Sequence, residues 1–291
     1  MTVRRFAVVG DPVSHSKSPV MQGAAMRALG LPHTYEAVRA NAEQLPEVVQ
    51  KLRDGFYDGL NVTVPHKERV LALVDALDPS ARVAGAANTL VRGDGGRLVA
   101  HNTDAPALAA ELRRLAARES WPSGARALVL GSGGAARAAV TAIGVHLGVR
   151  DIAVRARSFV DPARRDAFMA TAPCPIAPQA WTASAEDEAR TFLVVQATTA
   201  GMLGADPGDE VAGIVAWGAL PANAVAIDVV YAPRNTPWLR AARARGLRCD
   251  DGLGMLARQG ALALELWLRA LDAEDPFAGG SPLRAMRAAL E

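Results

Sequence analysis

The sequence predicts an α/β protein with a mostly parallel sheet, for two reasons. Short apolar runs, each about one strand long, alternate with longer amphipathic, alanine-rich segments along most of the chain. Repeated strand–helix–strand order is typical of a parallel sheet covered by helices, and neither an all-β fold nor a helical bundle shows it. The length of 291 residues also favours two domains over one.

The expected elements follow from this alternation. Strands are expected at residues 6–10, 34–38, 59–64, 88–92, 127–131, 151–155, 192–198 and 224–231. Helices are expected at residues 19–29, 43–53, 66–76, 105–118, 135–147, 236–245 and 253–271. Ser18 before Pro19 resembles a helix N-cap followed by proline at the first helical position. Pro65 is expected to open the helix at 66–76 in the same way.

Composition excludes several classes of partner. The net charge of +2 comes from arginines scattered among acids, which argues against nucleic acid. Cys174 and Cys249 stand far apart and the five histidines form no ligand pair, so neither a disulfide nor a metal site is expected. The apolar run after Arg5 is too short for a signal peptide, and no window reaches the roughly 18 apolar residues of a membrane helix. A cytoplasmic protein without a membrane partner is expected.

A glycine-rich turn stands in the second half of the chain. In ALVLGSGGAARAAV, Gly131, Gly133 and Gly134 lie between an apolar strand and an amphipathic helix. Such a turn lets backbone N–H groups and the helix N-terminus bind a pyrophosphate. The third small position is Ala136 rather than glycine. With the strand that follows at 151–155, the pattern predicts a dinucleotide site.

The end of that second strand indicates which dinucleotide binds. An NAD site usually places Asp or Glu there, about 20 residues after the turn, to bind the ribose 2′-hydroxyl. Residues 154–158 read VRARS, and the first acid is Asp161. Arginine can pair with a 2′-phosphate through two parallel hydrogen bonds. NADP is therefore the expected cofactor, with Arg155 and Arg164 as candidate second ligands. The alternative is that these arginines only face solvent.

Eight short stretches, taken together in order and spacing, resemble the shikimate dehydrogenase family over nearly the whole chain. They are SHSKSP (14–19), NVTVPHK (61–67), GAANT (85–89), NTD (102–104), GSGGAA (131–136), QATTAGM (196–202), DVVY (228–231) and DGLGMLARQG (251–260). The resemblance implies reversible NADPH-dependent reduction of 3-dehydroshikimate to shikimate, in the pathway to chorismate and the aromatic amino acids. It also implies a substrate domain at 1–103 plus 253–291 and a Rossmann-like NADP domain at 104–252. The C-terminal helices should then pack back on the first domain.

By the same resemblance, Lys67 and Asp104 are the catalytic acid/base pair. The chain has 29 arginines and only three lysines, so a lysine at the end of NVTVPHK stands out. Reduction of a carbonyl needs a proton for the developing alkoxide, and the reverse reaction needs a base. An ammonium can supply and recover that proton, whereas arginine stays protonated at any working pH. The chemistry therefore requires lysine, and not arginine, at position 67.

The resemblance also assigns binding residues. For the substrate, Ser16 and Ser18 would hold the carboxylate, Tyr231 would lie on the carboxylate side, and the hydroxyls would meet Asn61, Thr63, Asn88 and Gln259. For the cofactor, the expected residues are Gly131, Gly133, Gly134, Ala135, Arg157, Ser158, Thr198, Met202, Val229 and Gly252. Since Gln259 lies on a C-terminal helix, that helix must reach the first domain.

The chain departs from the family pattern at a few positions, and some alternatives stay open. The family most often has glycines on either side of its N-T-D motif, where this chain has Ala100 and Ala105. Its N-A-T motif begins here with Gln196. A quinate/shikimate dehydrogenase, an enzyme for an amino-substituted analogue, or a binding paralogue without turnover would fit the same scaffold. The expected partner is the small-molecule substrate, and the expected assembly is a monomer or homodimer.

Overall fold

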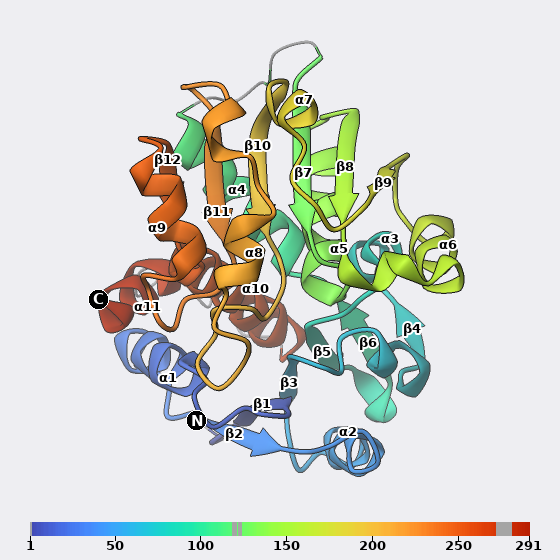
Figure 1. The fold of residues 1–291 in the computed structure, drawn as a ribbon. Coiled ribbons are helices and arrows are strands. Elements are labelled where there is room, and N and C mark those ends of the chain that lie inside the picture. Colours follow the sequence, from blue (N-terminus) through green and yellow to red (C-terminus); the bar gives the residue numbers. More distant parts are fainter. Residues whose placement is uncertain (1, 118–120, 122–123, 272–280) are drawn as a thin grey trace. The chain divides into compact units, whose positions relative to one another are not determined.

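The computed structural model describes residues 2–117, 121, 124–271 and 281–291. The chain forms two compact units, each with its own six-stranded sheet (Figure 1). The first unit is Met1–Asp104 with Leu256–Glu291, and the second is Ala105–Met255. The chain therefore passes into the second unit after Asp104 and returns to the first unit at Leu256. None of the helices in the described part of the chain has the length and apolarity to cross a membrane.

The first unit has a mixed sheet in the order β2-β1-β3-β5-β6-β4, in which only β5 runs against the others. Its strands are β1 (Arg5–Gly10), β2 (Thr34–Arg39), β3 (Gly59–Val62), β4 (Ala76–Leu77), β5 (Thr89–Arg92) and β6 (Leu98–His101). Its helices are α1 (Ser18–Ala28), α2 (Leu45–Arg53), α3 (Pro79–Ala84), α10 (Leu253–Ala270), which begins in the second unit, α11 (Pro282–Leu290) and the 3₁₀ turns η1 (Arg69–Leu73) and η2 (Asp94–Gly96).

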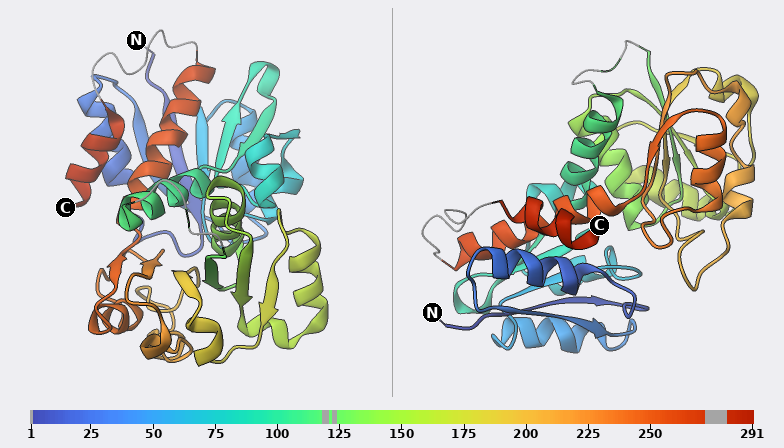
Figure 2. Two further views of the ribbon diagram at one scale, coloured as in Figure 1. Left: turned by 90° about the horizontal axis from the view of Figure 1, so that it is seen from above. Right: turned by 90° about the vertical axis from the view of Figure 1, so that its left-hand side faces the viewer.

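Helices cover both faces of this sheet. On one face α2 buries Leu45 and Leu52 against strand residues such as Leu60. On the other face Trp267 of α10 stacks on Phe6, with ring centroids 4.9 Å apart, and its indole N–H donates to the Leu90 carbonyl. In the right view of Figure 2, the light-blue α2 and the red C-terminal helices lie on opposite sides of the blue strands. The expectation that the C-terminal helices pack back on the first unit is confirmed.

The second unit has an all-parallel sheet in the order β12-β11-β10-β7-β8-β9. When these strands are numbered 1 to 6 along the chain and the sheet is read from the β9 edge, the order is 3-2-1-4-5-6. This is the strand order of the Rossmann dinucleotide-binding fold. Its strands are β7 (Arg126–Leu130), β8 (Asp151–Arg155), β9 (Ala177–Gln179), β10 (Thr191–Gln196), β11 (Val225–Asp228) and β12 (Arg248–Asp250). Its helical elements are α4 (Asp104–Ala116), α5 (Gly134–Thr141), the π-helix η3 (Ala142–His146), η4 (Arg157–Val160), α6 (Pro162–Ala170), α7 (Ala185–Glu188), α8 (Asp209–Gly213), η5 (Trp217–Ala219) and α9 (Pro237–Ala244).

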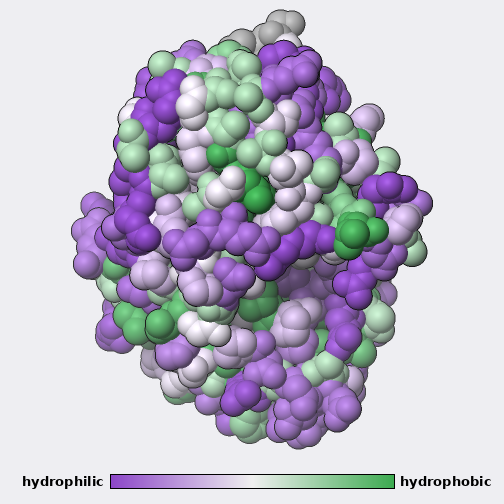
Figure 3. Space-filling model, viewed as in Figure 1, coloured by the Kyte–Doolittle hydropathy of each residue, from purple (hydrophilic) through white to green (hydrophobic). Residues whose placement is uncertain are grey.

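The core of the second unit lies between the sheet and the helices on its faces. Trp238 and Leu239 of α9 and Val211 of α8 belong to one buried apolar cluster with Leu128 and Val194 of the strands. Figure 2, right, shows the orange α9 and the green α4 on opposite sides of these strands. On the face seen in Figure 3, hydrophilic residues surround small, separate apolar areas.

One predicted helix is wrong. Residues 66–76 do not form an α-helix, because only the short 3₁₀ turn Arg69–Leu73 is helical there. The Lys67 carbonyl accepts a hydrogen bond from the Ala87 backbone N–H at 2.7 Å, and the His66 ring bonds the Ala40 carbonyl. These long-range bonds hold the segment as a turn, so Pro65 does not open a helix. Three strands also end two or three residues earlier than expected, at Val62, Gln196 and Asp228.

Candidate active site

Lys67 and Asp104, far apart in the sequence, meet in the first unit. The Lys67 Nζ donates to Asp104 Oδ2 at 2.6 Å, and the two side chains are 15% and 5% exposed. Lys67 follows β3, and Asp104 is the first residue of α4, just beyond β6. Those two strands run in the same direction, so the segments that follow them leave the same edge of the sheet. The alanines at 100 and 105 are buried and leave this pairing in place.

Asn88 joins this pair to a C-terminal helix. Its Nδ2 lies 3.0 Å from Asp104 Oδ1, 2.8 Å from Thr103 Oγ1 and 3.1 Å from Gln259 Oε1. An amide nitrogen carries only two N–H groups, so it cannot donate to three acceptors at once. The Asp104 carboxylate has about four acceptor sites and the amide oxygen of Gln259 has two, so both keep spare acceptor capacity. A ligand that carries hydroxyl donors would match them.

Asn61 is hydrogen-bonded to this cluster through Asn88 and Thr89. It is 4% exposed, accepts from the Tyr35 hydroxyl at 2.7 Å, and donates to the Asn88 carbonyl and to Thr89 Oγ1. Its amide groups thus already have protein partners. Both of its N–H groups hold neighbouring residues in place, whereas Oδ1, with one donor, keeps a second acceptor site that a substrate hydroxyl could use.

Thr63, Ser16 and Ser18 lie at the same edge of the sheet, on the segments that follow β3 and β1. Thr63 packs so close to Gly10 that a Cβ there would lie 2.4 Å from Thr63 Cγ2. Ser16 Oγ accepts from the Ser18 backbone N–H at 3.2 Å. Ser18 is the first residue of α1 rather than its cap, because the N-cap position falls on Lys17. The predicted cap is therefore wrong, and the buried Ser18 has no capping role.

Sequence reasoning missed three residues of this cluster: Thr103, Tyr35, and Thr89, which accepts from Asn61. The Thr103 hydroxyl accepts from Asn88, and the Thr103 N–H donates to Asn88 Oδ1 at 2.7 Å. Thr103 stands inside the NTD motif, so the motif itself carried the signal. Tyr35 lies in a strand of the first unit, and nothing in its local sequence marks it as a partner of Asn61.

The glycine-rich turn has the geometry of a pyrophosphate site in the second unit. Gly131 has φ +116°, and a Cβ there would lie 3.0 Å from the Ala197 carbonyl oxygen, so no larger residue fits well. Helix α5 begins at Gly134, with Ala135 in its first turn, and its N-cap Gly133 provides no side-chain cap. The first N–H groups of the helix are therefore not capped by a side chain and can bind an anion. The turn follows β7 next to β10, where the strand order reverses and ligands bind in such folds.

The other predicted cofactor residues follow the neighbouring strands. Thr198 and Met202 come after β10, Val229 after β11 and Gly252 after β12. A Cβ on Gly252 would lie 2.1 Å from the Val229 carbonyl oxygen, so this position requires glycine. Gln196, which stands where the family has asparagine, is buried and accepts from the Thr198 N–H. Tyr231, predicted near the substrate carboxylate, also belongs to this unit, in the segment after β11.

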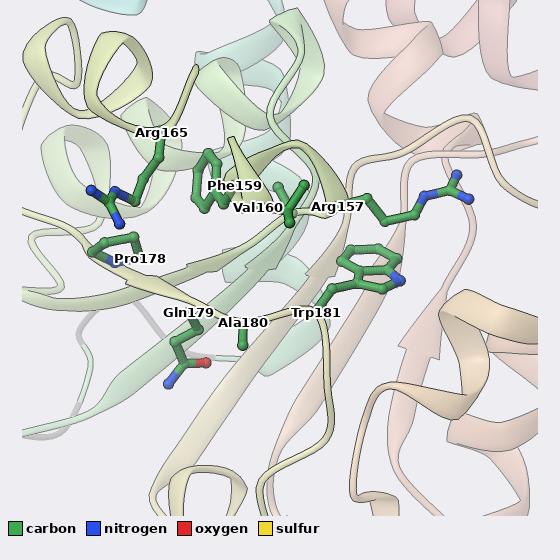
Figure 4. A pocket seen from close by; sticks show the side chains of 9 residues that line it. Arg157, Phe159, Val160, Arg165, Pro178, Gln179, Ala180 and Trp181 are labelled. Atoms are coloured by element: carbon green, nitrogen blue, oxygen red, sulfur yellow. The ribbon is translucent and has the colours of Figure 1, made fainter. Parts of the chain in front are cut away.

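Arg157 and Ser158 follow β8. The Ser158 hydroxyl lies 2.7 Å from the Ser132 hydroxyl, which ties the end of β8 to the glycine-rich turn. Arg157 borders a pocket of about 460 Å³ together with Phe159, Arg165 and Trp181. In Figure 4, Arg157 and Trp181 extend in the same direction on one side of this pocket, and Arg165 and Pro178 lie on the other.

Arg155 is not a second phosphate ligand, and that prediction is wrong. Its side chain is 1% exposed and pairs with the fully buried Glu188 at 2.8 Å. It also donates to the Ile214 carbonyl and to Gln179. Helices cover both faces of this parallel sheet, so Arg155 is buried together with its neighbours Val154 and Ala156. The other candidate, Arg164, is 73% exposed and lies 3.5 Å from Asp161.

Asp228 is a fully buried acid among the cofactor-side segments. It accepts from Thr236 Oγ1 at 2.7 Å, from the Val230 N–H at 2.9 Å and from Gln196 Nε2 at 3.2 Å. Burial raises the pKa of Asp228 to about 7, since desolvation outweighs the hydrogen bonds from Thr236 and Val230. The nearby charge of Asp251 acts in the same direction.

This shift predicts a pH-dependent stability. The pKa of Asp228 in the fold lies above that of an unfolded chain, roughly 3.9. The contribution of Asp228 to the free energy of unfolding is therefore fully present below about pH 4 and is lost as the pH rises through about 7. Asp228→Asn should flatten the fall in the free energy of unfolding over this range, as measured by urea denaturation at several pH values. Asp209→Asn, at an exposed position, is the control for the lost charge, and an equal slope in wild type and Asp228→Asn would contradict the assignment.

Comparison with known proteins agrees with this geometry. A sequence profile described as the shikimate dehydrogenase substrate binding domain matches residues 8–90. A shikimate dehydrogenase (NADP(+)) of Methylobacterium radiotolerans is 42% identical over 268 residues, which are 91% of each chain. This chain belongs to the shikimate dehydrogenase family. A solved structure similar to this chain is a shikimate 5-dehydrogenase from Thermus thermophilus in complex with NADP(H) and shikimate. The match covers 98% of this chain and 99% of the Thermus chain, with a TM-score of 0.77 and 36% identity.

The shikimate dehydrogenase fold is not restricted to one substrate. A 5-ketofructose reductase of Gluconobacter in its ligand-free form covers 100% of this chain and 98% of its own, with a TM-score of 0.81 and 26% identity. The fold alone therefore does not fix the substrate, and the side chains of the site must do so. Within the described residues, no group of three His, Cys, Asp or Glu side chains is arranged to hold a metal ion.

Proposed function

We propose that this chain is an NADP-dependent shikimate dehydrogenase that interconverts 3-dehydroshikimate and shikimate on the way to chorismate. The observation that carries the proposal is the Lys67–Asp104 pair, 2.6 Å apart and joined through Asn88 to Gln259. The sequence identity to named shikimate dehydrogenases over nearly the whole chain supports the substrate. We further propose a cytoplasmic monomer or homodimer without nucleic-acid or membrane partners, supported by the near-neutral charge and by the finding that none of the described helices could span a membrane.

The two units supply different parts of the reaction. The first unit, with Lys67, Asp104 and the polar cluster, would hold the substrate. In the second unit, the glycine-rich turn, the uncapped start of α5, and Arg157 with Ser158 fit a phosphorylated dinucleotide. NADPH, when bound there, supplies the hydride for the carbonyl carbon.

The protein's own part in the chemistry is proton transfer. Lys67, as an ammonium, would donate a proton to the carbonyl oxygen as charge develops there, and its neutral amine would accept that proton in the reverse direction. Asp104 holds Nζ in place through their hydrogen bond. The spare acceptors of Asp104 and Gln259 would receive hydrogen bonds from substrate hydroxyls. Ser16 and Ser18 would donate to the carboxylate, with Thr63 beside them on the same edge of the sheet.

The substrate and cofactor preferences can be tested together. Initial rates should be measured with shikimate and with quinate, each against NADP and NAD. We expect shikimate with NADP to give the highest kcat/KM. In the family, threonine at the position of Ser18 accompanies quinate use, whereas serine fits shikimate. Comparable efficiency on quinate would contradict the role of Ser18, and equal use of NAD and NADP would contradict that of Arg157.

A further inference from the structure

Arg157, the residue proposed to bind the 2′-phosphate, is paired with acids of its own unit. Its Nη1 lies 3.2 Å from Glu210 Oε2 and 3.6 Å from Asp206 Oδ2. The second carboxylate oxygen of Glu210 accepts from the Trp181 indole N–H at 2.6 Å. The Arg157 guanidinium also lies over the Trp181 ring, 5.7 Å from its centre. Glu210 thus bridges Arg157 and Trp181, which border the pocket in Figure 4.

Contacts within the second unit fix the positions of Glu210 and Asp206. Glu210 lies in the first turn of α8, which packs against the core through Val211. Asp206 Oδ1 accepts from the Gly208 N–H at 2.9 Å, and the Asp206 carbonyl accepts from the Gly201 N–H at 2.7 Å. The short segment between β10 and α8 therefore keeps both carboxylates near the guanidinium.

The charge balance at Arg157 is consequently negative. One guanidinium faces two carboxylates, although a 2′-phosphate carries close to two negative charges of its own. A carboxylate on Arg157 occupies N–H donors of the guanidinium that the phosphate would use. Unphosphorylated NAD has no 2′-phosphate and does not need these donors.

We propose that Glu210 is a specificity-determining residue that weakens binding of the 2′-phosphate by competing for Arg157. Glu210 thereby reduces the preference for NADP over NAD that Arg157 provides. This inference rests on the proposed cofactor, but it concerns only residues of the second unit. It predicts that removing the charge of Glu210 tightens binding of 2′-phosphorylated nucleotides, and that the effect requires Arg157.

The test uses nucleotide fragments and the whole chain. Adenosine 2′,5′-bisphosphate and adenosine 5′-monophosphate are titrated calorimetrically into wild type, Glu210→Gln, Arg157→Ala and the double variant. Glu210→Gln should tighten the bisphosphate roughly two- to fivefold, as expected for removing an exposed ion pair, and change the monophosphate less. Arg157→Ala should weaken the bisphosphate about tenfold or more. In the Arg157→Ala background, the Glu210 substitution should then have no further effect. Glu186→Gln, at an exposed position on α7, is the control for net charge.

The outcomes separate this inference from the proposed function, because neither nucleotide fragment contains nicotinamide and neither titration includes shikimate. Tighter bisphosphate binding by Glu210→Gln without any shikimate oxidation would leave the inference standing and reject the function. Unchanged or weaker binding by Glu210→Gln would overturn the inference, as would tightening that persists without Arg157. Absence of bisphosphate binding to both wild type and Glu210→Gln would overturn it as well.

Discussion

Lys67→Ala is expected to lower kcat for shikimate oxidation about a hundredfold or more, while KM changes much less. A positioned acid/base typically contributes this much to a rate. Substrate contacts from Ser16, Ser18, Asn88 and Gln259 would remain, so binding should largely survive. Initial rates over a range of shikimate and NADP concentrations separate the two effects.

Two further variants show whether the lysine acts through its proton or only through its charge. Lys67→Arg keeps the positive charge beside Asp104 but cannot release a proton at a working pH, so it should be nearly as slow as the alanine variant. Lys51→Ala removes another lysine of the first unit, one that pairs with Glu47 on the exposed face of α2. It should retain normal turnover. Near-normal kcat in Lys67→Ala or Lys67→Arg would refute the acid/base role.

Glu188→Gln is expected to destabilise the protein by about 3–5 kcal/mol, because it leaves the Arg155 guanidinium buried without a counter-charge. Both side chains are almost completely buried, and Glu188 Oε1 also accepts from the Ala216 N–H. The free energy of unfolding from urea denaturation measures the loss. The double variant Arg155→Met with Glu188→Leu removes both charges and should recover most of it.

The control for this prediction is an exposed ion pair of the same chain. Lys51 and Glu47 lie 2.9 Å apart with side chains 49% and 70% exposed. Such a pair contributes roughly 0.3–0.5 kcal/mol, so Glu47→Gln should hardly change the unfolding curve. If Glu188→Gln cost no more than Glu47→Gln, the buried pair would not hold the core of the second unit as described.

The sequence predicted the parts of the fold that depend on local pattern. The strands at 6–10 and 127–131 were evident because each is a short apolar run next to a glycine. The glycine-rich turn was evident because strand, glycines and helix follow directly in the chain. Lys67 and Asp104 were paired through their motifs, and the structure places them 2.6 Å apart.

The errors arose where long-range partners override local pattern. Residues 66–76 have helical composition, but hydrogen bonds to Ala40 and Ala87 hold their first residues as a turn. Arg155 looked like a surface ligand because its partner, Glu188, lies 33 residues away beyond a proline-rich stretch. The Arg157–Glu210 pair spans 53 residues and carries no local signal either. Such contacts become visible only when the strands are assembled into a sheet.

The most direct test of the central claim follows a labelled hydrogen. The unmodified chain is incubated with 3-dehydroshikimate and NADPH that carries deuterium at both hydrogen positions of nicotinamide C4, and the product is analysed by mass spectrometry. Our account predicts shikimate that carries a deuterium on the former carbonyl carbon, formed far faster than with Lys67→Ala. Failure to form shikimate, or formation of shikimate without deuterium, would contradict it.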